Sequence, residues 1–151
     1  MQLLARALGA PDNPAHGTEI GFAPLDVVAA DPVLDPLGGR PTVLHWHGDA
    51  AELPAGARLL ASSALTPVQA FRAGSALGLQ FHLEVDPGLL AAWLDEPTMA
   101  RDLGRRGVPD RQGVSDQAAR ALPLLVPAAE VGLAAFAAQV RTAADRTAAR
   151  R

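Results

Sequence analysis

The chain has 151 residues, a common size for one domain, and 49% of them are apolar. That share is ordinary for a globular protein and well above the share in disordered chains. The net charge of -3 is too small to indicate a nucleic acid or an anionic membrane as partner. The sequence contains no cysteine, which excludes disulfides, thiolate metal sites and thiol catalysis by these residues alone.

The first half of the chain is predicted to contain a short helix followed by several strands. Residues 2–8 are helix-prone, and Gly9 offers a left-handed stop. Residues 11–17 are expected to form a loop. Pro24 interrupts the first extended stretch, and Gly74 is expected to turn the chain between the last two strands. The strand candidates are residues 19–28, 42–46, 58–62, 68–73 and 76–82.

The second half is predicted to be helical. Leu89, Leu90, Trp93 and Leu94 fall at helical spacing after residues 87–88. A further helix is expected over residues 115–122. Pro123 and Pro127 are expected to break the chain there, and a last helix begins at Ala128. Its apolar face is formed by Leu133, Phe136, Ala137 and Val140.

Strands followed by helices indicate an α/β fold with a sheet covered by helices. Parallel strands need crossover connections, which are usually helices, and the middle of this chain offers few. The sheet is therefore expected to be largely antiparallel, unless parallel strands lie upstream of Met1. No apolar run approaches the roughly 20 residues that span a membrane. We expect a cytoplasmic protein.

The most informative pair of residues is His82 with Glu84. Side chains two positions apart on a strand lie on the same face, roughly 7 Å apart at Cα, so Glu84 can reach the imidazole of His82. A carboxylate in that place fixes the tautomer of the ring and raises its basicity. The pair is the base-and-orienter half of a nucleophilic triad, although a solvated strand end would give the same pattern.

The surrounding sequence resembles that of class I glutamine amidotransferases. Residues 78–84, Gly-Leu-Gln-Phe-His-Leu-Glu, are similar to the family signature Gly-x-Gln-Phe-His-Pro-Glu. Residues 45–49, His-Trp-His-Gly-Asp, followed by Leu-Pro at 53–54, resemble a segment of the group similar to GMP synthase glutaminase domains. Residues 60–63 and 68–72 match the strand pair that precedes the signature. Leu83 stands where the family usually has proline.

The resemblance implies a fold and an activity. The parent domain would be a three-layer sandwich with a flavodoxin-like parallel sheet. Its activity would be the hydrolysis of glutamine to glutamate and ammonia by a Cys-His-Glu triad, with no cofactor and no metal. This chain, residues 1–151, would be part of such a domain. The motifs lie in residues 1–94, and residues 95–151 form a helical C-terminal part.

The resemblance also implies roles for individual residues. His82 would be the general base and Glu84 its orienter. Gln2 resembles the family's substrate-holding glutamine, and His47 and Asp49 would line or support the substrate cleft. Aligned on Gln2, the nucleophilic cysteine would fall just before Met1. We therefore expect a domain cut after that position, without its first strands, inactive by itself and prone to self-association.

Two other functions remain open from the sequence. The first is a catalytically inactive amidotransferase-like domain that binds or regulates a partner. The second is a metal-dependent hydrolase using His45, His47 and Asp49, since a His-x-His pair with a nearby carboxylate is able to bind a metal. A buried cluster near a substrate cleft explains the same trio without metal. Possible partners include a synthetase that accepts ammonia.

Overall fold

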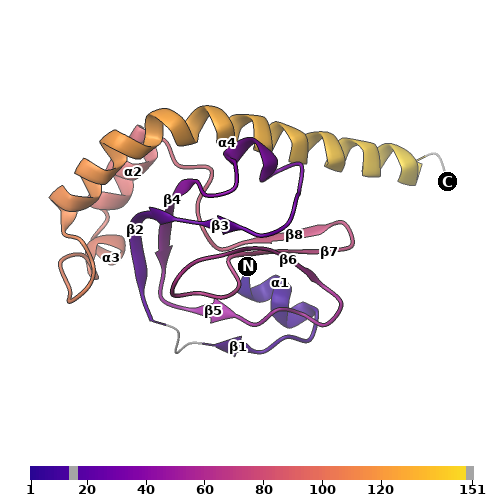
Figure 1. The fold of residues 1–151 in the computed structure, drawn as a ribbon, viewed down its shortest axis with the longest axis horizontal. Helices are drawn as coiled ribbons and strands as arrows, with labels where there is room; N and C mark the ends of the chain where they lie inside the picture. Colours follow the sequence, from indigo (N-terminus) through magenta and orange to yellow (C-terminus); the bar gives the residue numbers. More distant parts are fainter. Residues whose placement is uncertain (14–16, 149–151) are drawn as a thin grey trace.

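The structure, a computed structural model, describes residues 1–13 and 17–148, so residues 14–16 of the expected loop lie outside the described part. Strands fill the first half and helices the second, as Figure 1 shows. The elements are α1 (Gln2–Ala7), β1 (Asp12–Asn13), β2 (Glu19–Pro24), β3 (Asp26–Val27), the 3-10 helix η1 (Asp35–Leu37), β4 (Thr42–His47), β5 (Ala50–Ala51), β6 (Arg58–Ser62), β7 (Ala70–Ala73), β8 (Ala76–Leu79), α2 (Pro87–Asp95), α3 (Pro97–Ala100) and α4 (Arg111–Ala148).

The described strands pair only in antiparallel fashion. β3, β6, β7 and β8 form a four-stranded sheet in that order, while β2 pairs with β4 and β1 with β5. Gly74, at φ +58°, turns the chain between β7 and β8, as expected. The mixed α/β class is therefore confirmed, with antiparallel sheets. The parallel sheet implied for the parent domain is not formed by the described residues.

The β2–β4 ribbon packs against α4. Its register runs from Glu19 opposite His47 to Pro24 opposite Thr42. Pro24 ends β2 instead of interrupting a longer strand, and the break falls at the fully buried Leu25. Proline is tolerated there because β2 is hydrogen-bonded to β4 alone and has a free edge. An isolated bridge between Leu44 and His82 adds the segment after β8 to the other side of β4.

Helix α4 is one continuous helix of 38 residues, so the predicted break at Pro123 and Pro127 was wrong. Each proline removes one backbone donor and bends a helix, and the helix in Figure 1 curves from a rising first part into a horizontal second part. The free energy gained by burying apolar side chains of the first part outweighs the cost of the two lost hydrogen bonds. The buried residues of α4 are Val114, Ala118, Ala121, Leu122, Leu125 and Ala129.

The second part of α4 is less buried than expected. Leu133, Phe136 and Val140 were predicted to lie on a packing face, but 38%, 38% and 53% of their respective surfaces are exposed. In Figure 1 the end of the helix runs beyond the sheet, while Leu133 and Phe136 border a hollow that Leu77 and Leu79 of β8 also line. Within the described residues, this apolar face is therefore only partly covered.

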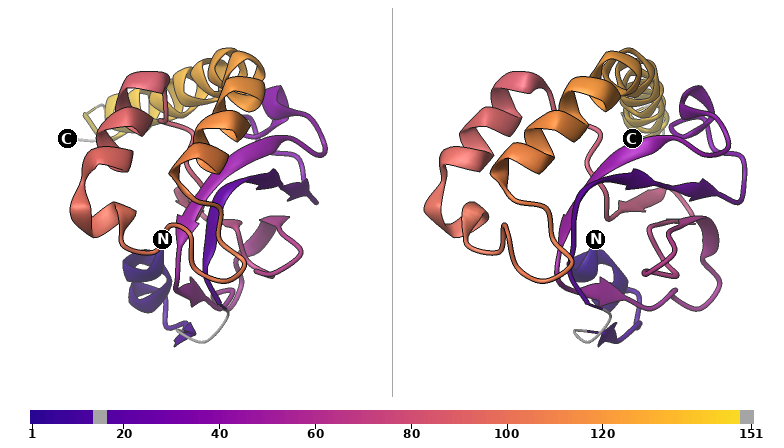
Figure 2. Two further views of the ribbon diagram at one scale, coloured as in Figure 1. Left: turned by 90° about the vertical axis from the view of Figure 1, so that its left-hand side faces the viewer. Right: turned by 60° about the vertical axis from the view of Figure 1, so that its left-hand side comes forward.

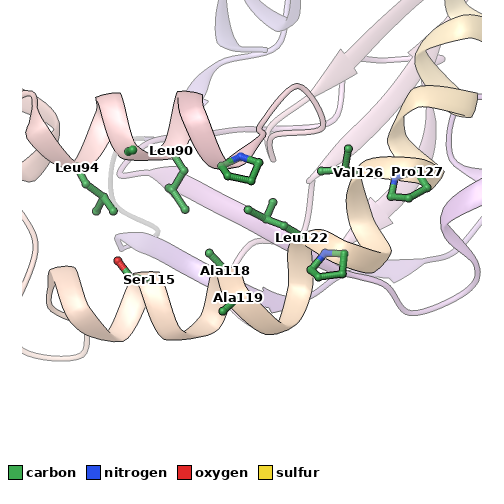
Figure 3. A pocket seen from close by; sticks show the side chains of 11 residues that line it. Leu90, Leu94, Ser115, Ala118, Ala119, Leu122, Val126 and Pro127 are labelled. Atoms are coloured by element: carbon green, nitrogen blue, oxygen red, sulfur yellow. The ribbon is translucent and has the colours of Figure 1, made fainter.

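An apolar groove separates α2 from the first part of α4. Leu90 and Leu94 of α2 face Ala118 and Leu122 of α4 across it, as Figure 3 shows. The two helices lie side by side over one end of the β2–β4 ribbon (Figure 2). The groove thus lies between two helices of the second half of the chain, which the sequence predicted to be helical.

By length and composition, the stretch Arg111–Arg146 of α4 would be able to cross a membrane. One such helix is weak evidence, because the core helix of a soluble protein passes the same test. Here the first part of the helix packs against β2, β4 and η1. The absence of a membrane partner stays a prediction.

Gly132 allows α4 to approach the loop before η1. A Cβ atom at this position would lie 2.2 Å from the backbone oxygen of Val33, which is far inside contact distance. We expect Gly132→Ala to lower the free energy of unfolding by about 1–3 kcal/mol, although glycine to alanine in a helix usually stabilises by up to about 1 kcal/mol. Urea denaturation measures the difference. Gly39→Ala, which has open space around it, is the matched control; equal stability of both variants would contradict the close approach.

Candidate functional site

The backbone of His82 is fixed by the central strand. Its amide donates to the carbonyl of Leu44 in β4, at 2.9 Å, and Leu44 is fully buried. Two residues earlier, the amide of Gln80 donates to the carbonyl of Gln69 at 2.8 Å. The segment after β8 is therefore held between β4 and the segment before β7. His82 leaves the sheet at a defined point.

The side chain of Glu84 meets the ring of His82, as the i, i+2 spacing predicted. Glu84 Oε1 lies 2.6 Å from His82 Nδ1, with about a quarter of the histidine side chain and half of the glutamate side chain exposed. The hydrogen bond with His82 lowers the pKa of Glu84, against a smaller opposing effect of burial. The ionised carboxylate favours the tautomer with a proton on Nδ1. Within residues 1–13 and 17–148, no hydrogen bond occupies the other ring nitrogen, Nε2.

Trp93 holds the ring of His82 from the side. The rings of His82 and Trp93 meet edge to face, with centroids 4.7 Å apart, and Trp93 in turn contacts Trp46 in the same manner at 5.8 Å. Such contacts add about 0.5–1.5 kcal/mol beyond area burial. The helical spacing of Trp93 is visible in the sequence, but this role is not, because only the tertiary fold brings α2 beside residue 82.

A second cluster of polar residues surrounds the carboxylate of Glu19 at the start of β2. Ser63 Oγ donates to Glu19 Oε1 at 2.8 Å, and Thr66 Oγ1 and Gln69 Nε2 donate to Oε2 at 2.6 Å and 2.8 Å. His47 Nε2 lies 3.4 Å from Glu19 Oε2. Burial works to raise the pKa of Glu19, but hydrogen bonds from His47, Thr66 and Ser63 outweigh it and lower the pKa to about 2.

The His-x-His pair of β4 belongs to this cluster. The rings of His45 and His47 lie 6.0 Å apart, on the same face of the strand. Their carboxylate neighbour is Glu19, so the expected trio of His45, His47 and Asp49 was wrong in its third member. Glu19 was missed because it lies opposite His47 only through the β2–β4 register.

The side chain of Gln2 contacts the backbone of Asp49. The side-chain amides of Gln2 and Gln80 both donate to the carbonyl oxygen of Asp49, at 3.3 Å and 2.8 Å. The loop after β4 is thereby tied to the first helix and to the segment that leads to His82. The carboxylate of Asp49 forms none of the hydrogen bonds found among the described residues.

Several known proteins are similar to this chain, although no family model matches it. The GMP synthase (glutamine-hydrolysing) of Thermomicrobium roseum is 43% identical over 86 residues, which are 56% of this chain and 16% of that protein. A glutamine-hydrolysing GMP synthase subunit from Saccharolobus solfataricus is 37% identical over 87 residues, which are 56% of this chain and 46% of that protein. The chain thus spans less than half the length of these curated relatives.

Solved structures share the fold. A glutamine amidotransferase from Thermotoga maritima superposes with a TM-score of 0.73 at 27% identity, covering 87% of this chain and 56% of that one. A glutamine amidotransferase from Methylobacillus flagellatus gives a TM-score of 0.75 at 22% identity, over 91% of this chain and 59% of that one, and supports the fold alone. Fold and relatives define a glutamine amidotransferase-like protein. Relatives that are 37% to 43% identical to this chain are named GMP synthase.

The partly buried carboxylate of Glu19 makes the stability of the fold depend on pH in the acid range. Its folded-state pKa, about 2, is lower than its ordinary value of 4.5. The charged form therefore stabilises the fold above about pH 5, and this contribution is lost as pH falls from about 4.5 to 2. Allowing for partial exposure, we expect a loss on the order of 2 kcal/mol.

Glu19→Gln removes this pH dependence. The variant is expected to be less stable than the natural chain at pH 7, with a difference that shrinks toward pH 2. Denaturant titrations at several pH values measure the difference, and Glu52→Gln, a change at an exposed position, is the matched control. A constant difference between the natural chain and Glu19→Gln from pH 7 to pH 2 would contradict the assignment.

Proposed function

We propose that this chain supplies the base and the orienter of a class I glutamine amidotransferase site, which hydrolyses glutamine to glutamate and ammonia. The observation that supports the proposal is the 2.6 Å contact between His82 Nδ1 and Glu84 Oε1, within a segment that matches the family signature. The nucleophilic thiol comes from outside residues 1–151, because these residues contain no cysteine. The proposal makes the chain one part of a larger catalytic unit.

In this mechanism, His82 Nε2 takes the proton of the attacking thiol and later donates it to the leaving ammonia. Glu84 keeps the proton of the ring on Nδ1, which leaves the lone pair of Nε2 available, and stabilises the imidazolium that forms. Trp93 limits rotation of the ring. The exposed quarter of the His82 side chain leaves access for a substrate and for the thiol.

Three further residues are proposed to serve glutamine binding. Gln2 and Asp49, linked through the Asp49 carbonyl, are the candidates for substrate contact. His47 is 7% exposed at its side chain and is held against Glu19. We therefore assign His47 to the support of the cleft.

Partners and cellular context follow from the relatives as proposals. Because one relative is named as one subunit of a GMP synthase, a synthetase that accepts the ammonia is the proposed partner. Residues 1–94 would carry the motifs of the site, and residues 95–151 would form a helical C-terminal part. A cytoplasmic location also stays a prediction. The exposed apolar residues of α4, such as Leu124 and Val131, support self-association of the isolated chain.

The isolated 151-residue chain is expected to release no ammonia from glutamine. A base without a nucleophile cannot form the covalent intermediate of the family. A coupled ammonia assay with purified chain measures this, with boiled protein as the baseline. Release above the baseline that disappears in His82→Ala would contradict the requirement for an external thiol.

A graft tests the roles of His82 and Glu84. The matched region of this chain replaces the corresponding 87 residues in the relative from Saccharolobus solfataricus. We expect the chimaera to release ammonia, because the rest of that relative would supply the thiol. His82→Gln and Glu84→Gln in the chimaera should each lower kcat by about 10²- to 10⁴-fold.

Glu52→Gln in the chimaera is the matched control, since Glu52 is an exposed carboxylate for which no catalytic role is proposed. An active chimaera that tolerates His82→Gln would contradict the proposal. The alternative function, a catalytically inactive domain that binds or regulates a partner, is favoured by the lack of a thiol in this chain. It predicts that a correctly folded chimaera stays inactive.

A further inference from the structure

His45 is a buried histidine whose ring nitrogens lack partners. The residue is 1% exposed, and neither Nδ1 nor Nε2 forms a hydrogen bond within the described part of the chain. An unsatisfied polar atom in the interior costs about 1–3 kcal/mol. Nothing in the proposed glutaminase chemistry uses this ring. The cost therefore points to a function that the catalytic pair does not explain.

The ring of His45 lies beside two other ligand-type residues. One ligand atom each from Glu19, His45 and His47 lies within 4.8 Å of the other two. His47 Nδ1 is also buried and lacks a hydrogen bond within the described residues. Two imidazoles and one carboxylate are a common ligand set for zinc and for divalent iron.

The distance between two of the ligand atoms suits a metal ion of this kind. Two atoms bound to one tetrahedral zinc at about 2.1 Å lie about 3.4 Å apart. The observed separation of His47 Nε2 and Glu19 Oε2 is 3.4 Å, long for a hydrogen bond but matched to that spacing. The three side chains also come from paired strands, because Glu19 lies opposite His47 in the β2–β4 register, and paired strands hold ligands rigidly.

The surrounding donors fit as well. Ser63, Thr66 and Gln69 donate hydrogen bonds to the Glu19 carboxylate and hold it beside the two imidazoles. Donors of this type orient the ligands of metal sites.

We propose that Glu19, His45 and His47 form a binding site for one divalent transition-metal ion, with zinc as the preferred occupant. Three protein ligands leave a fourth position for water. The ion would link β2 to β4, because Glu19 lies on β2 and both histidines lie on β4. The site is separate from the His82–Glu84 pair and does not depend on the proposed glutaminase activity.

Cobalt binding tests the site directly. The full chain, without a histidine tag, is freed of metal with a chelator, dialysed and titrated with Co²⁺. We expect the visible absorption of a four-coordinate ion to saturate at one equivalent and to disappear when Zn²⁺ is added, because zinc binds more tightly than cobalt. The melting temperature should rise with added Zn²⁺.

Variants locate the ligands. Glu19→Gln and His47→Gln should each weaken binding at least tenfold. His82→Gln, which removes a histidine outside the cluster, is the matched control and should bind as the natural chain does. The site would be overturned if His82→Gln weakened metal binding as much as His47→Gln does. It would also be overturned if the natural chain bound the metal no more tightly than His47→Gln.

X-ray absorption of the zinc-loaded natural chain keeps the test independent of how the variants fold. The expected spectrum shows two imidazoles and oxygen ligands. A spectrum with one imidazole or none would overturn the assignment even if a zinc ion is bound.

Discussion

The burial of one carboxylate, that of Glu19, constrains the arrangement of the two larger sheets. A charged group leaves water at a large cost unless it is fully hydrogen-bonded. Ser63, Thr66 and Gln69 meet that requirement, and all three lie between β6 and β7. The β2–β4 ribbon is thereby fixed against the four-stranded sheet.

The position of the proposed catalytic base follows from this constraint. Once β4 is placed, the carbonyl of Leu44 can accept from the amide of His82, and the ring of His82 emerges beside Trp93. Glu84 then reaches the ring because it lies two positions after His82, on the same side of the extended segment. Glu19 thus contributes to the geometry of a pair that it does not touch.

The parts of this arrangement that could be predicted from the sequence are local. The β7–β8 hairpin follows from alternation around Gly74, and the contact of His82 with Glu84 follows from a spacing of two residues. Glu19 could not be assigned, because its partners are 28 to 50 residues away and depend on strand register. Helix α4 was divided at Pro123 and Pro127 because propensity alone cannot weigh two lost hydrogen bonds against a buried face.

The contact between Phe22 and Gln117 has a consequence for synthesis of the chain. The amide of Phe22 donates to Gln117 Oε1 across 95 positions, where α4 covers the β2–β4 ribbon. At about 5–20 residues per second, a ribosome needs roughly 5 to 20 s to add those positions. During that time the apolar side of the new ribbon has no helix over it. The packing of the ribbon against α4 therefore forms only after residue 117 has been added to the chain.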